Sequence, residues 1–456
     1  MIGSDPRKSA LSILNALDQG HSTLDRLISE RFDPVEPQAL SRRDQNLAYA
    51  LIYGVLRWRG RLDWIIHQFT RDPVERIDPQ VLNILRIGLF QIFHLDRVPD
   101  SAAVNTSVEL AKRSAAPWVV RFVNGLLRNA IRNRSRIQWP DETSDPLLWL
   151  SVDQSFPLWL TRRWADRFGF EETLALCRFL NSIPPLTLRT NTLKITRDHL
   201  AESLRPVAET VAATPVIPEG ISLYGIDRVV NELPGFSDGH FQVQDEAAQL
   251  VAHVMAPEPG ETILDACAGL GGKTGHIAQM IDNRGHIFAL DKEIRKLDAL
   301  NGEMSRLGVT IVTTRPHDLD RGFASGEFPL FDRVLLDAPC SGIGVIRRNP
   351  DTKWSSNPAD FSRLAAVQER FLDHAAYLVR PGGLLVYAVC SIAPEETGDV
   401  VSAFLKAHPE FSMDTPPKFR RQFATLIDNQ GCFRSMPHVH KMDGFFIARL
   451  KKSAAV

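Results

Sequence analysis

The segment Thr262-Ile-Leu-Asp-Ala-Cys-Ala-Gly-Leu-Gly-Gly-Lys-Thr274 decides the fold that this sequence predicts. Its first part, residues 262–266, has the apolar run of a buried strand, and Asp265 stands near the end of that strand. Three glycines, at positions 269, 271 and 272, then form a turn into a predicted helix over residues 273–281. Glycine lets the backbone approach a ligand closely, and a helix N-terminus favours negative charge. The segment therefore predicts a ligand seat between a strand and a helix.

The residues that follow alternate between strand and helix patterns. Further strands are predicted over residues 286–291, 309–313, 333–337 and 383–389, and further helices over residues 293–307 and 361–378. Such alternation predicts a parallel sheet with helices on both faces, whose ligands gather at the carboxyl ends of the strands. Residues 444–450 are predicted as an edge strand.

The details of the glycine turn distinguish between kinds of nucleotide site. A dinucleotide fingerprint needs glycine at position 274, where Thr274 stands, and a phosphate-binding loop needs glycine at position 267, where Cys267 stands. Asp291, 20 residues beyond Gly271, is placed to grip ribose hydroxyls. S-adenosylmethionine carries an ammonium and a sulfonium rather than a pyrophosphate, so a carboxylate at the strand end suits it. A glycine turn without a ligand is the alternative.

Two later strand ends each carry a cysteine, in Leu335-Leu-Asp-Ala-Pro-Cys-Ser-Gly342 and in Val386-Tyr-Ala-Val-Cys-Ser391. Carbon 5 of cytosine is a poor nucleophile, but a thiolate added to carbon 6 converts the ring to an enamine that attacks a methyl group. The reaction also needs a carboxyl group near ring nitrogen 3 and a base that removes the proton from carbon 5. Cys390, Asp337 and Cys340 supply this set. For either cysteine alone, a buried inert thiol is the alternative.

Length and composition limit the remaining possibilities. A chain of 456 residues predicts two or three domains, and 44% hydrophobic with 23% charged residues is typical of a globular protein. Five scattered cysteines predict neither a disulfide framework nor a zinc ribbon, which indicates a reducing compartment. We recognise no signal peptide, and no run reaches the roughly 18 apolar residues of a membrane helix.

The first part of the chain has the periodicity of helices, among them residues 10–17, 45–56, 80–95, 102–114 and 118–132, with Ser41 as an N-cap. Residues 1–140 carry 20 Lys or Arg against 14 Asp or Glu, although the whole chain has a net charge of −1. Arginines interleave with an aromatic residue in Arg57-Trp-Arg-Gly-Arg61 and gather again at Arg128, Arg132, Arg134 and Arg136. Such a surface suits phosphate contacts and base stacking. A helical bundle whose arginine stems cover its core is the alternative.

Two stretches of this region resemble the helical RNA-binding domain of the NusB antitermination factor. They are Phe93-His-Leu-Asp-Arg-Val-Pro-Asp-Ser-Ala-Ala-Val-Asn-Thr-Ser-Val-Glu-Leu-Ala-Lys-Arg113 and Phe122-Val-Asn-Gly-Leu-Leu-Arg128. That domain also forms the N-terminal module of the Sun/Fmu family of bacterial 16S ribosomal RNA cytosine-C5 methyltransferases. After a polar linker at residues 135–146, a helix (157–181), a strand (186–193) and a second helix (197–204) resemble the small α+β domain of that family. Gly239-His-Phe-Gln-Val-Gln-Asp-Glu-Ala-Ala248 resembles its entry into the catalytic domain.

The resemblance covers nearly the whole chain and implies three domains. They are an all-α NusB-like RNA-binding domain over residues 1–140, a small α+β, ferredoxin-like domain over residues 147–240, and a catalytic domain over residues 241–456. The last is expected to be an α/β, Rossmann-like class I methyltransferase domain with a mixed, mostly parallel sheet.

The glycine turn carries the strongest part of this resemblance. Residues 267–274 resemble the Cys-Ala-Ala-Pro-Gly-Gly-Lys-Thr loop of RNA cytosine-C5 methyltransferases, with Gly269 and Leu270 in place of Ala and Pro. The departure adds backbone freedom. The resemblance implies that S-adenosylmethionine is lined by Cys267, Ala268, Gly269, Leu270, Gly271, Gly272 and Lys273. It also implies that Asp291 holds the ribose, that Asp318 lies near the adenine, and that Asp337 lies between cofactor and base.

The two cysteines admit two assignments. Pro339-Cys340 matches the Pro-Cys dipeptide of DNA cytosine methyltransferases, in which that cysteine attacks. The RNA family instead uses the cysteine of a later Cys-Ser pair, which is Cys390-Ser391 here, and its Pro-Cys thiol assists release of the product. By this resemblance Cys390 is the nucleophile and Cys340 acts in release. Val389 departs from the threonine that is common before the nucleophile.

The loop after the Pro-Cys dipeptide, Arg347-Arg-Asn-Pro-Asp-Thr-Lys-Trp354, is similar to a run in the same family. Its arginines and tryptophan suit phosphate binding and base stacking, and a solvated basic loop is the alternative. Cys177 is predicted to lie in the core. Cys432 with His438 and His440 is not expected to hold a metal, because no further ligand stands at a tight spacing.

Together these features predict methyl transfer from S-adenosylmethionine to carbon 5 of a cytosine in 16S ribosomal RNA, through a covalent cysteine adduct. Because Cys390 cannot reach a base inside a duplex, the target nucleotide is expected to be unpaired or flipped out. The alternatives are the same chemistry on transfer RNA and a non-catalytic RNA-binding antitermination or assembly factor. We expect a monomer in the cytoplasm, with no metal and no membrane partner.

Overall fold

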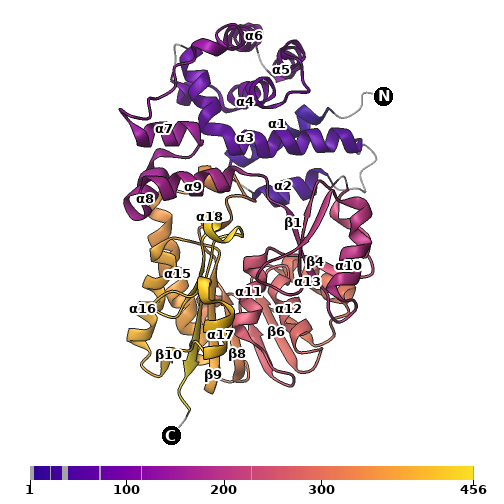
Figure 1. Cartoon of the computed structure of the whole chain (residues 1–456), viewed down its shortest axis with the longest axis vertical. Coiled ribbons are helices and arrows are strands. Elements are labelled where there is room, and N and C mark those ends of the chain that lie inside the picture. Colours follow the sequence, from indigo (N-terminus) through magenta and orange to yellow (C-terminus); the bar gives the residue numbers. More distant parts are fainter. Residues whose placement is uncertain are drawn as a thin grey trace. The chain divides into compact units, whose positions relative to one another are not determined.

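The computed structural model describes residues 5–454, apart from residues 21, 33–39, 71–72, 115 and 227. The chain divides into two compact units, Met1–Ser182 with Asn349–Ser355, and Ile183–Arg348 with Ser356–Val456 (Figure 1). The boundary after Ser182 falls inside the stretch 147–240, for which the sequence predicts one small α+β domain. None of the helices in the described part of the chain is long and apolar enough to cross a membrane.

The described residues of the first unit form helices and turns. The helices are α1 (Pro6–Asp18), α2 (Leu24–Arg31), α3 (Arg42–Phe69), α4 (Pro79–His94), α5 (Asp100–Ser114), α6 (Pro117–Arg132), α7 (Pro146–Asp153), α8 (Leu158–Phe168) and α9 (Phe170–Asn181). Ser41 accepts a hydrogen bond from the amide of Asp44 at the start of α3, which confirms the predicted N-cap. The single helix predicted over residues 157–181 is two helices, because Gly169 between α8 and α9 has a φ of 84°.

The predicted arginine clusters of the first unit contain both partnered and exposed side chains. Arg57 is buried, and Arg59 and Arg61 pair with Asp18 and Asp153 at 3.0 and 2.9 Å. These arginines therefore cover the helical bundle, as the alternative interpretation predicts. Arg134 donates to the carbonyl of Ile92 at 2.5 Å. By contrast, the side chains of Arg128, Arg132 and Arg136 are exposed.

The short segment Asn349–Ser355 packs within the first unit and carries α14 (Thr352–Ser355). Lys353 is fully buried and donates to the carbonyls of Arg57 and Ser155 at 3.0 and 3.1 Å. The indole of Trp354 donates to the carbonyl of Leu56 at 2.6 Å. In α3 the amides of Gly60 and Arg61 donate to Ser155 Oγ at 2.8 and 3.3 Å instead of to the carbonyls four residues earlier. Those two carbonyls, of Leu56 and Arg57, are the ones that accept from Trp354 and Lys353. The N–H of Trp354 is therefore used in this packing, although its side chain is only half-buried, and base stacking by its ring stays a prediction.

The second unit begins with a small antiparallel sheet. Its strands are β1 (Leu186–Thr190), β2 (Thr210–Ala213), β3 (Gly220–Tyr224) and β4 (Phe241–Val243), in the order β2-β3-β1-β4. Helix α10 (Arg197–Leu204) covers this sheet, and its Leu200 and Leu204 share a core with Leu188, Ile221 and Phe241. The predicted helix over residues 197–204 is confirmed.

The larger sheet has the order β10-β12-β9-β8-β5-β6-β7, with β11 paired to β12. The strands are β5 (Thr262–Asp265), β6 (His286–Asp291), β7 (Val312–Pro316), β8 (Phe331–Asp337), β9 (Val379–Val389), β10 (Phe411–Met413), β11 (Phe433–Ser435) and β12 (Phe445–Lys452). The helices are α11 (Glu246–Met255), α12 (Gly272–Met280), α13 (Ile294–Leu307), α15 (Pro358–Tyr377), α16 (Gly398–Ala407), α17 (Pro417–Gln422) and α18 (Pro437–His440). Pairing is parallel from β7 to β9 and antiparallel at β12. The predicted mixed, mostly parallel sheet is confirmed.

Each face of this sheet has its own apolar core. One core joins α11, α12 and α13 to sheet residues such as Ile263 and Leu335. The other joins α15 and α16 to their neighbours Leu264 and Leu336. Because neighbouring strand residues point to opposite faces, every second residue of a strand enters the same core. The sheet is thus covered on both sides, as the alternation of strand and helix patterns predicts.

Two strand predictions need correction. The strand predicted at the edge, residues 444–450, is β12, which lies inside the sheet because β10 and β11 pair with the side that β9 leaves free. The strand predicted over residues 309–313 is β7, which begins only at Val312. The amide of Val309 instead donates to the carbonyl of Met304 after α13, where Gly308 has a φ of 75°.

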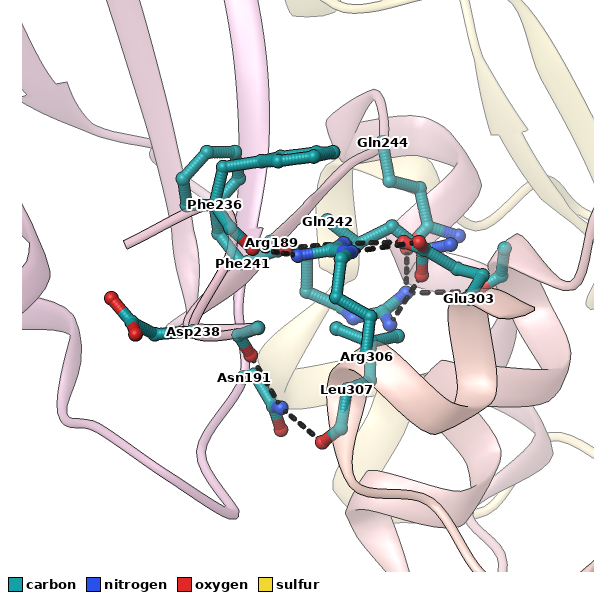
Figure 2. Close-up of polar contacts among 12 residues, drawn as sticks. Arg189, Asn191, Phe236, Asp238, Phe241, Gln242, Gln244, Glu303, Arg306 and Leu307 are labelled. Carbon is teal, nitrogen blue, oxygen red and sulfur yellow. Dashed lines mark hydrogen bonds and ion pairs between the residues drawn. The ribbon is translucent and has the colours of Figure 1, made fainter. Parts of the chain in front are cut away.

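The small sheet is tied to the helices of the larger sheet within the second unit (Figure 2). Arg189 of β1 is buried and donates to Gln242 Oε1 at 2.7 Å, to Gln244 Oε1 and to the carbonyl of Gly272 at 2.7 Å. Asn191 Nδ2 donates to the carbonyls of Gly239 and Leu307, both at 2.8 Å. The carbonyl of Gly272 belongs to the first turn of α12, so Arg189 helps to hold the end of the glycine turn.

Candidate active site

The glycine turn lies where three parallel strands end. Strand β5 ends at Asp265, β6 at Asp291 and β8 at Asp337. The amide of Ala266 donates to the carbonyl of Leu335 at 2.9 Å, and the amide of Ala268 donates to that of Leu290 at 2.8 Å. The start of the turn is therefore hydrogen-bonded to the carboxyl ends of β8 and β6, where ligands of such sheets bind.

Two residues of the turn have a positive φ, which glycine adopts without strain. Gly269 has a φ of 55°, and its amide donates to Asp291 Oδ2 at 3.1 Å. Gly271 has a φ of 83°, and a Cβ atom there would lie 2.6 Å from Leu300. Leu270 between them is 62% exposed. The residues Gly269 and Leu270, which replace Ala and Pro, thus form a turn with a positive φ at its first position.

Asp265 is the buried carboxyl group beneath the turn. Its Oδ2 accepts a hydrogen bond from Thr274 Oγ1 at 2.7 Å, whereas its Oδ1 is buried without a hydrogen-bond partner among the described residues. Burial raises the pKa of Asp265 to about 7. A buried acceptor without a donor is costly, so this atom fits a ligand that brings one, such as the ammonium of S-adenosylmethionine.

A depression of about 720 Å³ lies at the ends of β6 and β7. Its lining includes Lys292 and Glu293 after β6, Pro316 at the end of β7, and His317 and Asp318 after that strand. Asp291 lies one residue before this lining and accepts from the amide of Glu293 at 2.9 Å. Of the two residues predicted to hold the nucleoside, Asp318 lines this open space and Asp291 does not.

Lys273 connects the turn to the end of β8. Its Nζ donates to Asp337 Oδ2 at 2.5 Å, and its side chain is only 14% exposed. Burial alone lowers the pKa of Lys273, but the charge and hydrogen bond of Asp337, followed by the charge of Cys390, outweigh burial and raise it. Lys273 is therefore a cation that acts on both Asp337 and Cys390.

The two predicted cysteines meet at this edge of the sheet. Cys340 Sγ lies 3.2 Å from Cys390 Sγ; both thiols are free, and both residues are half-buried. The hydrogen bond with Cys390, then burial, then the charges of Cys390 and Glu396 raise the pKa of Cys340 well above its usual value. A thiol whose pKa is raised keeps its proton, so the Cys340 thiol is neutral.

Cys267 has a different environment from this pair. Burial, followed by the charges of Asp265, Asp337 and Asp291, raises the pKa of Cys267 well above its usual value. Its thiol therefore stays neutral, which suits a residue that lines a cofactor and does not attack.

One further residue, Glu396, belongs to this group although the sequence analysis does not single it out. Its side chain is fully buried beneath the two cysteine loops, and Ser391 Oγ donates to its Oε2 at 2.5 Å. In the sequence it stands in Pro394-Glu-Glu-Thr397, a polar stretch that is typical of an exposed turn. The only available signal is its position five residues after Ser391, close to a strand end that carries a predicted nucleophile.

The remaining predicted residues lie in the core or in hydrogen-bonded turns. Val389 and Cys177 are fully buried, and Cys432 is buried in the core. His440 accepts a hydrogen bond from the amide of Met436 at 2.8 Å and bonds the carbonyl of Thr425 at 3.0 Å, so both of its ring nitrogens have protein partners.

Among the described residues, one group has metal-ligand chemistry. The ligand atoms of Glu219, His253 and His276 all lie within 4.8 Å of one another. Both histidines bond the same oxygen, Glu219 Oε1, at 2.8 and 2.5 Å. These are hydrogen-bond distances, and they tie the loop before β3 to α11 and α12.

Three protein-family models match parts of this chain. The model of the 16S rRNA methyltransferase RsmB/F family matches residues 252–451, that of the NusB family matches residues 4–132, and that of the RsmF/B-like ferredoxin-like domain matches residues 156–229. The probable ribosomal RNA small subunit methyltransferase B of Synechocystis sp. is 37% identical over 98% of this chain and 99% of that protein. Its probable counterpart from Bacillus subtilis is 34% identical over 98% of each chain. The crystal structure of PH0851 covers 98% of this chain and 99% of that chain, with a TM-score of 0.81 and 27% identity.

The fold, the glycine turn and these relatives define an S-adenosylmethionine-dependent RNA methyltransferase. The chain belongs to the RsmB/F family of 16S rRNA methyltransferases, with a NusB-family region before its methyltransferase domain.

Proposed function

We propose that this enzyme methylates carbon 5 of a cytosine in 16S ribosomal RNA through a covalent adduct with Cys390. The observation that carries the proposal is the 3.2 Å separation of the Cys340 and Cys390 thiols, at the sheet edge where Lys273 pairs with Asp337. Methylation of a ring nitrogen or of a ribose hydroxyl needs no thiol. Two half-buried thiols side by side suit addition to, and release from, a pyrimidine ring.

The reaction begins with the thiolate of Cys390, which forms a bond to carbon 6 while the electron pair of the 5,6 double bond moves into the ring. As the adduct forms, charge moves to nitrogen 3, which takes a proton from solvent, and the carboxylate of Asp337, held by Lys273, accepts a hydrogen bond from that N–H. S-adenosylmethionine, when bound, supplies the methyl group as an electrophile for carbon 5. The target base must be unpaired or flipped out of its stack to reach Cys390.

Release requires that carbon 5 lose its proton and that Cys390 leave carbon 6. We assign the proton acceptor as Cys340, which passes its own proton to the departing sulfur of Cys390, 3.2 Å away, and takes the proton of carbon 5. The electron pair of that bond restores the 5,6 double bond, and the pair of the carbon–sulfur bond returns to Cys390. The raised pKa of Cys340 makes its thiolate a strong base, which supports this role.

The cofactor residues are assigned from the same geometry. We propose that residues 267–273 line S-adenosylmethionine and that Asp265 accepts a hydrogen bond from its ammonium group. We further propose that Asp291 and Asp318 hold the nucleoside at the open depression. We also propose that the reaction needs no metal, because its chemistry uses only thiols and carboxylates. Since the relatives are named for ribosomal RNA, we propose that the enzyme works in the cytoplasm, as a monomer.

The test is transfer of a labelled methyl group to protein-free small-subunit RNA, followed by identification of the modified nucleoside. Wild-type enzyme is expected to form 5-methylcytidine, and Cys390→Ala is expected to form none. Cys177→Ala, a change at a buried cysteine of the first unit, is the matched control and is expected to retain activity. Formation of a different methylated nucleoside, or unchanged turnover by Cys390→Ala, would contradict the proposal.

A further inference from the structure

We propose that Glu396 is a positioning residue that sets the separation and alignment of the Cys340 and Cys390 thiols. It lies in the short 3₁₀ turn Pro394–Glu396 that follows β9, and its side chain is fully buried. The proposal rests on the function proposed above, because it gives Glu396 a part in the reaction of these two cysteines.

The carboxylate of Glu396 binds the residue that follows each cysteine. Its Oε2 accepts hydrogen bonds from Ser341 Oγ and from Ser391 Oγ, both at 2.5 Å. Its Oε1 accepts a hydrogen bond from the amide of Ser341 at 2.7 Å. Ser341 is covalently joined to Cys340 and Ser391 to Cys390, so one side chain fixes both cysteine-bearing loops relative to each other.

Glu396 is itself held from two other elements. Gln368 of α15 donates through Nε2 to Glu396 Oε1 at 3.2 Å and to the carbonyl of Pro339 at 2.9 Å. The hydroxyl of Tyr387 of β9 donates to the carbonyl of Glu396 at 2.7 Å. Both partners are fully buried, so the network is rigid and shielded from water. A rigid carboxylate is what a positioning role requires, because a mobile one would not fix a distance.

The charge of Glu396 also acts on the thiol pair. After the hydrogen bond with Cys390, burial and the charge of Cys390, the negative charge of Glu396 is a further cause that raises the pKa of Cys340. The carboxylate therefore helps to keep the proton on Cys340. Within the described residues, the hydrogen bonds of Glu396 reach neither the glycine turn nor the lining of the open depression, which separates its effect from cofactor binding.

The first test measures the thiol geometry without any substrate. Diamide oxidises neighbouring thiols to a disulfide, and peptide mapping by mass spectrometry identifies the Cys340–Cys390 bond. Wild-type enzyme is expected to form this bond rapidly, whereas Glu396→Ala is expected to form it slowly or not at all. Glu396→Gln, which keeps the shape of the side chain, is expected to fall between them. Glu395→Gln makes the same chemical change one residue earlier and is the matched control.

The second test separates positioning from a merely structural role. Glu396→Ala is expected to lower kcat by about 10²-fold, the cost of a misplacement near 1 Å, while KM for cofactor and for RNA stays unchanged. Glu396→Gln is expected to recover part of kcat. If Glu396→Ala does not fold, the double variant Ser341→Ala, Ser391→Ala removes the two hydroxyl hydrogen bonds to Oε2 and leaves only that of the Ser341 amide, and it is expected to lower both kcat and the rate of disulfide formation.

Two results would overturn the proposal: wild-type rates of disulfide formation in Glu396→Ala, or a loss of kcat that follows the loss of folded protein in every variant. Absence of methyl transfer by the wild-type enzyme, with disulfide formation that still depends on Glu396, would contradict the proposed function alone. The two proposals therefore fail separately.

Discussion

Nζ of Lys273 lies 2.5 Å from Oδ2 of Asp337, and this ion pair joins the first turn of α12 to the end of β8. The lysine completes the glycine turn, whereas the aspartate precedes the Pro-Cys dipeptide. One contact therefore links the cofactor side of the proposed site to its cysteine side. The two side chains are 14% and 28% exposed, so water screens their attraction only in part.

Replacing Lys273 with Met is expected to lower kcat by about 10²-fold, because Asp337 loses the partner that orients it and Cys390 loses a neighbouring cation. The unpaired carboxylate is also expected to lower the free energy of unfolding by about 1–3 kcal/mol. Steady-state kinetics and thermal melting measure the two effects. Lys112→Met, at an exposed lysine of α5 that pairs with Glu109, is the control, and equal losses in both variants would contradict the role of Lys273.

Asp265 predicts a pH dependence of cofactor binding. Burial raises its pKa to about 7, so the carboxyl is neutral in acid and ionises as the pH rises through 7. Only the ionised form attracts the ammonium of S-adenosylmethionine, so affinity is expected to rise between pH 6 and pH 8, and binding near pH 6.5 should release a proton. Calorimetry in buffers of different ionisation enthalpy measures this release. Asp265→Asn should abolish both effects, and a pH-independent affinity in the wild type would contradict the assignment.

The same shift has a consequence for stability in the absence of cofactor. Because the folded pKa of Asp265 lies above its unfolded value near 3.8, the unfolded state loses its proton first. The free energy of unfolding is therefore expected to fall as the pH rises from about 4 to about 7, by at most about 1.4 kcal/mol per pH unit from this group. Urea unfolding of wild type and Asp265→Asn at several pH values should show a smaller fall in the variant.

Arg189 predicts a link between the small sheet and the glycine turn. Replacement with Met leaves the carbonyl of Gly272 and the side-chain oxygens of Gln242 and Gln244 without their buried donor. The free energy of unfolding of the second unit is expected to fall by roughly 3–5 kcal/mol, and the affinity for cofactor to fall with it. Calorimetric unfolding with and without cofactor measures both. Arg205→Ala, at an exposed arginine, is expected to change neither by more than about 1 kcal/mol.

Three exposed arginines on α6 predict a contact with RNA. Arg121, Arg128 and Arg132 recur at helical spacing on one face, together with Trp118, which is 62% exposed. Changing the three arginines to alanine is expected to raise KM for RNA without changing kcat. The slope of log affinity against log salt concentration is expected to become less steep by about 0.7 for each lost phosphate contact. RNA binding at several salt concentrations tests this expectation, with Arg205→Ala as control. An unchanged salt slope would contradict it.

Local sequence patterns predict the parts of this molecule that depend on neighbours in the chain. The glycine turn, the strand ends at Asp265, Asp291 and Asp337, and the meeting of Cys340 with Cys390 all follow from the rule that parallel strands end at one edge. The interior position of β12 is missed because it depends on β10 and β11, two short strands whose pairing the local pattern does not reveal.

Buried polar residues are harder to predict for a related reason. Lys353 and Glu396 stand in polar stretches that are typical of exposed loops, yet both are fully buried. Their partners lie on other elements: the carbonyls of Arg57 and Ser155 for Lys353, and the hydroxyls of Ser341 and Ser391 for Glu396. A charged residue is buried only where such partners converge, and no local pattern records that convergence.

The most direct test of the central claim is to trap the covalent intermediate. Cys340→Ala enzyme, incubated with S-adenosylmethionine and small-subunit RNA, is predicted to give an RNA–protein adduct that survives denaturing electrophoresis. Nuclease digestion and peptide sequencing by mass spectrometry should place the modified nucleotide on Cys390. An adduct on Cys340 in the Cys390→Ala enzyme, or methylated RNA from Cys390→Ala without any adduct, would contradict the account.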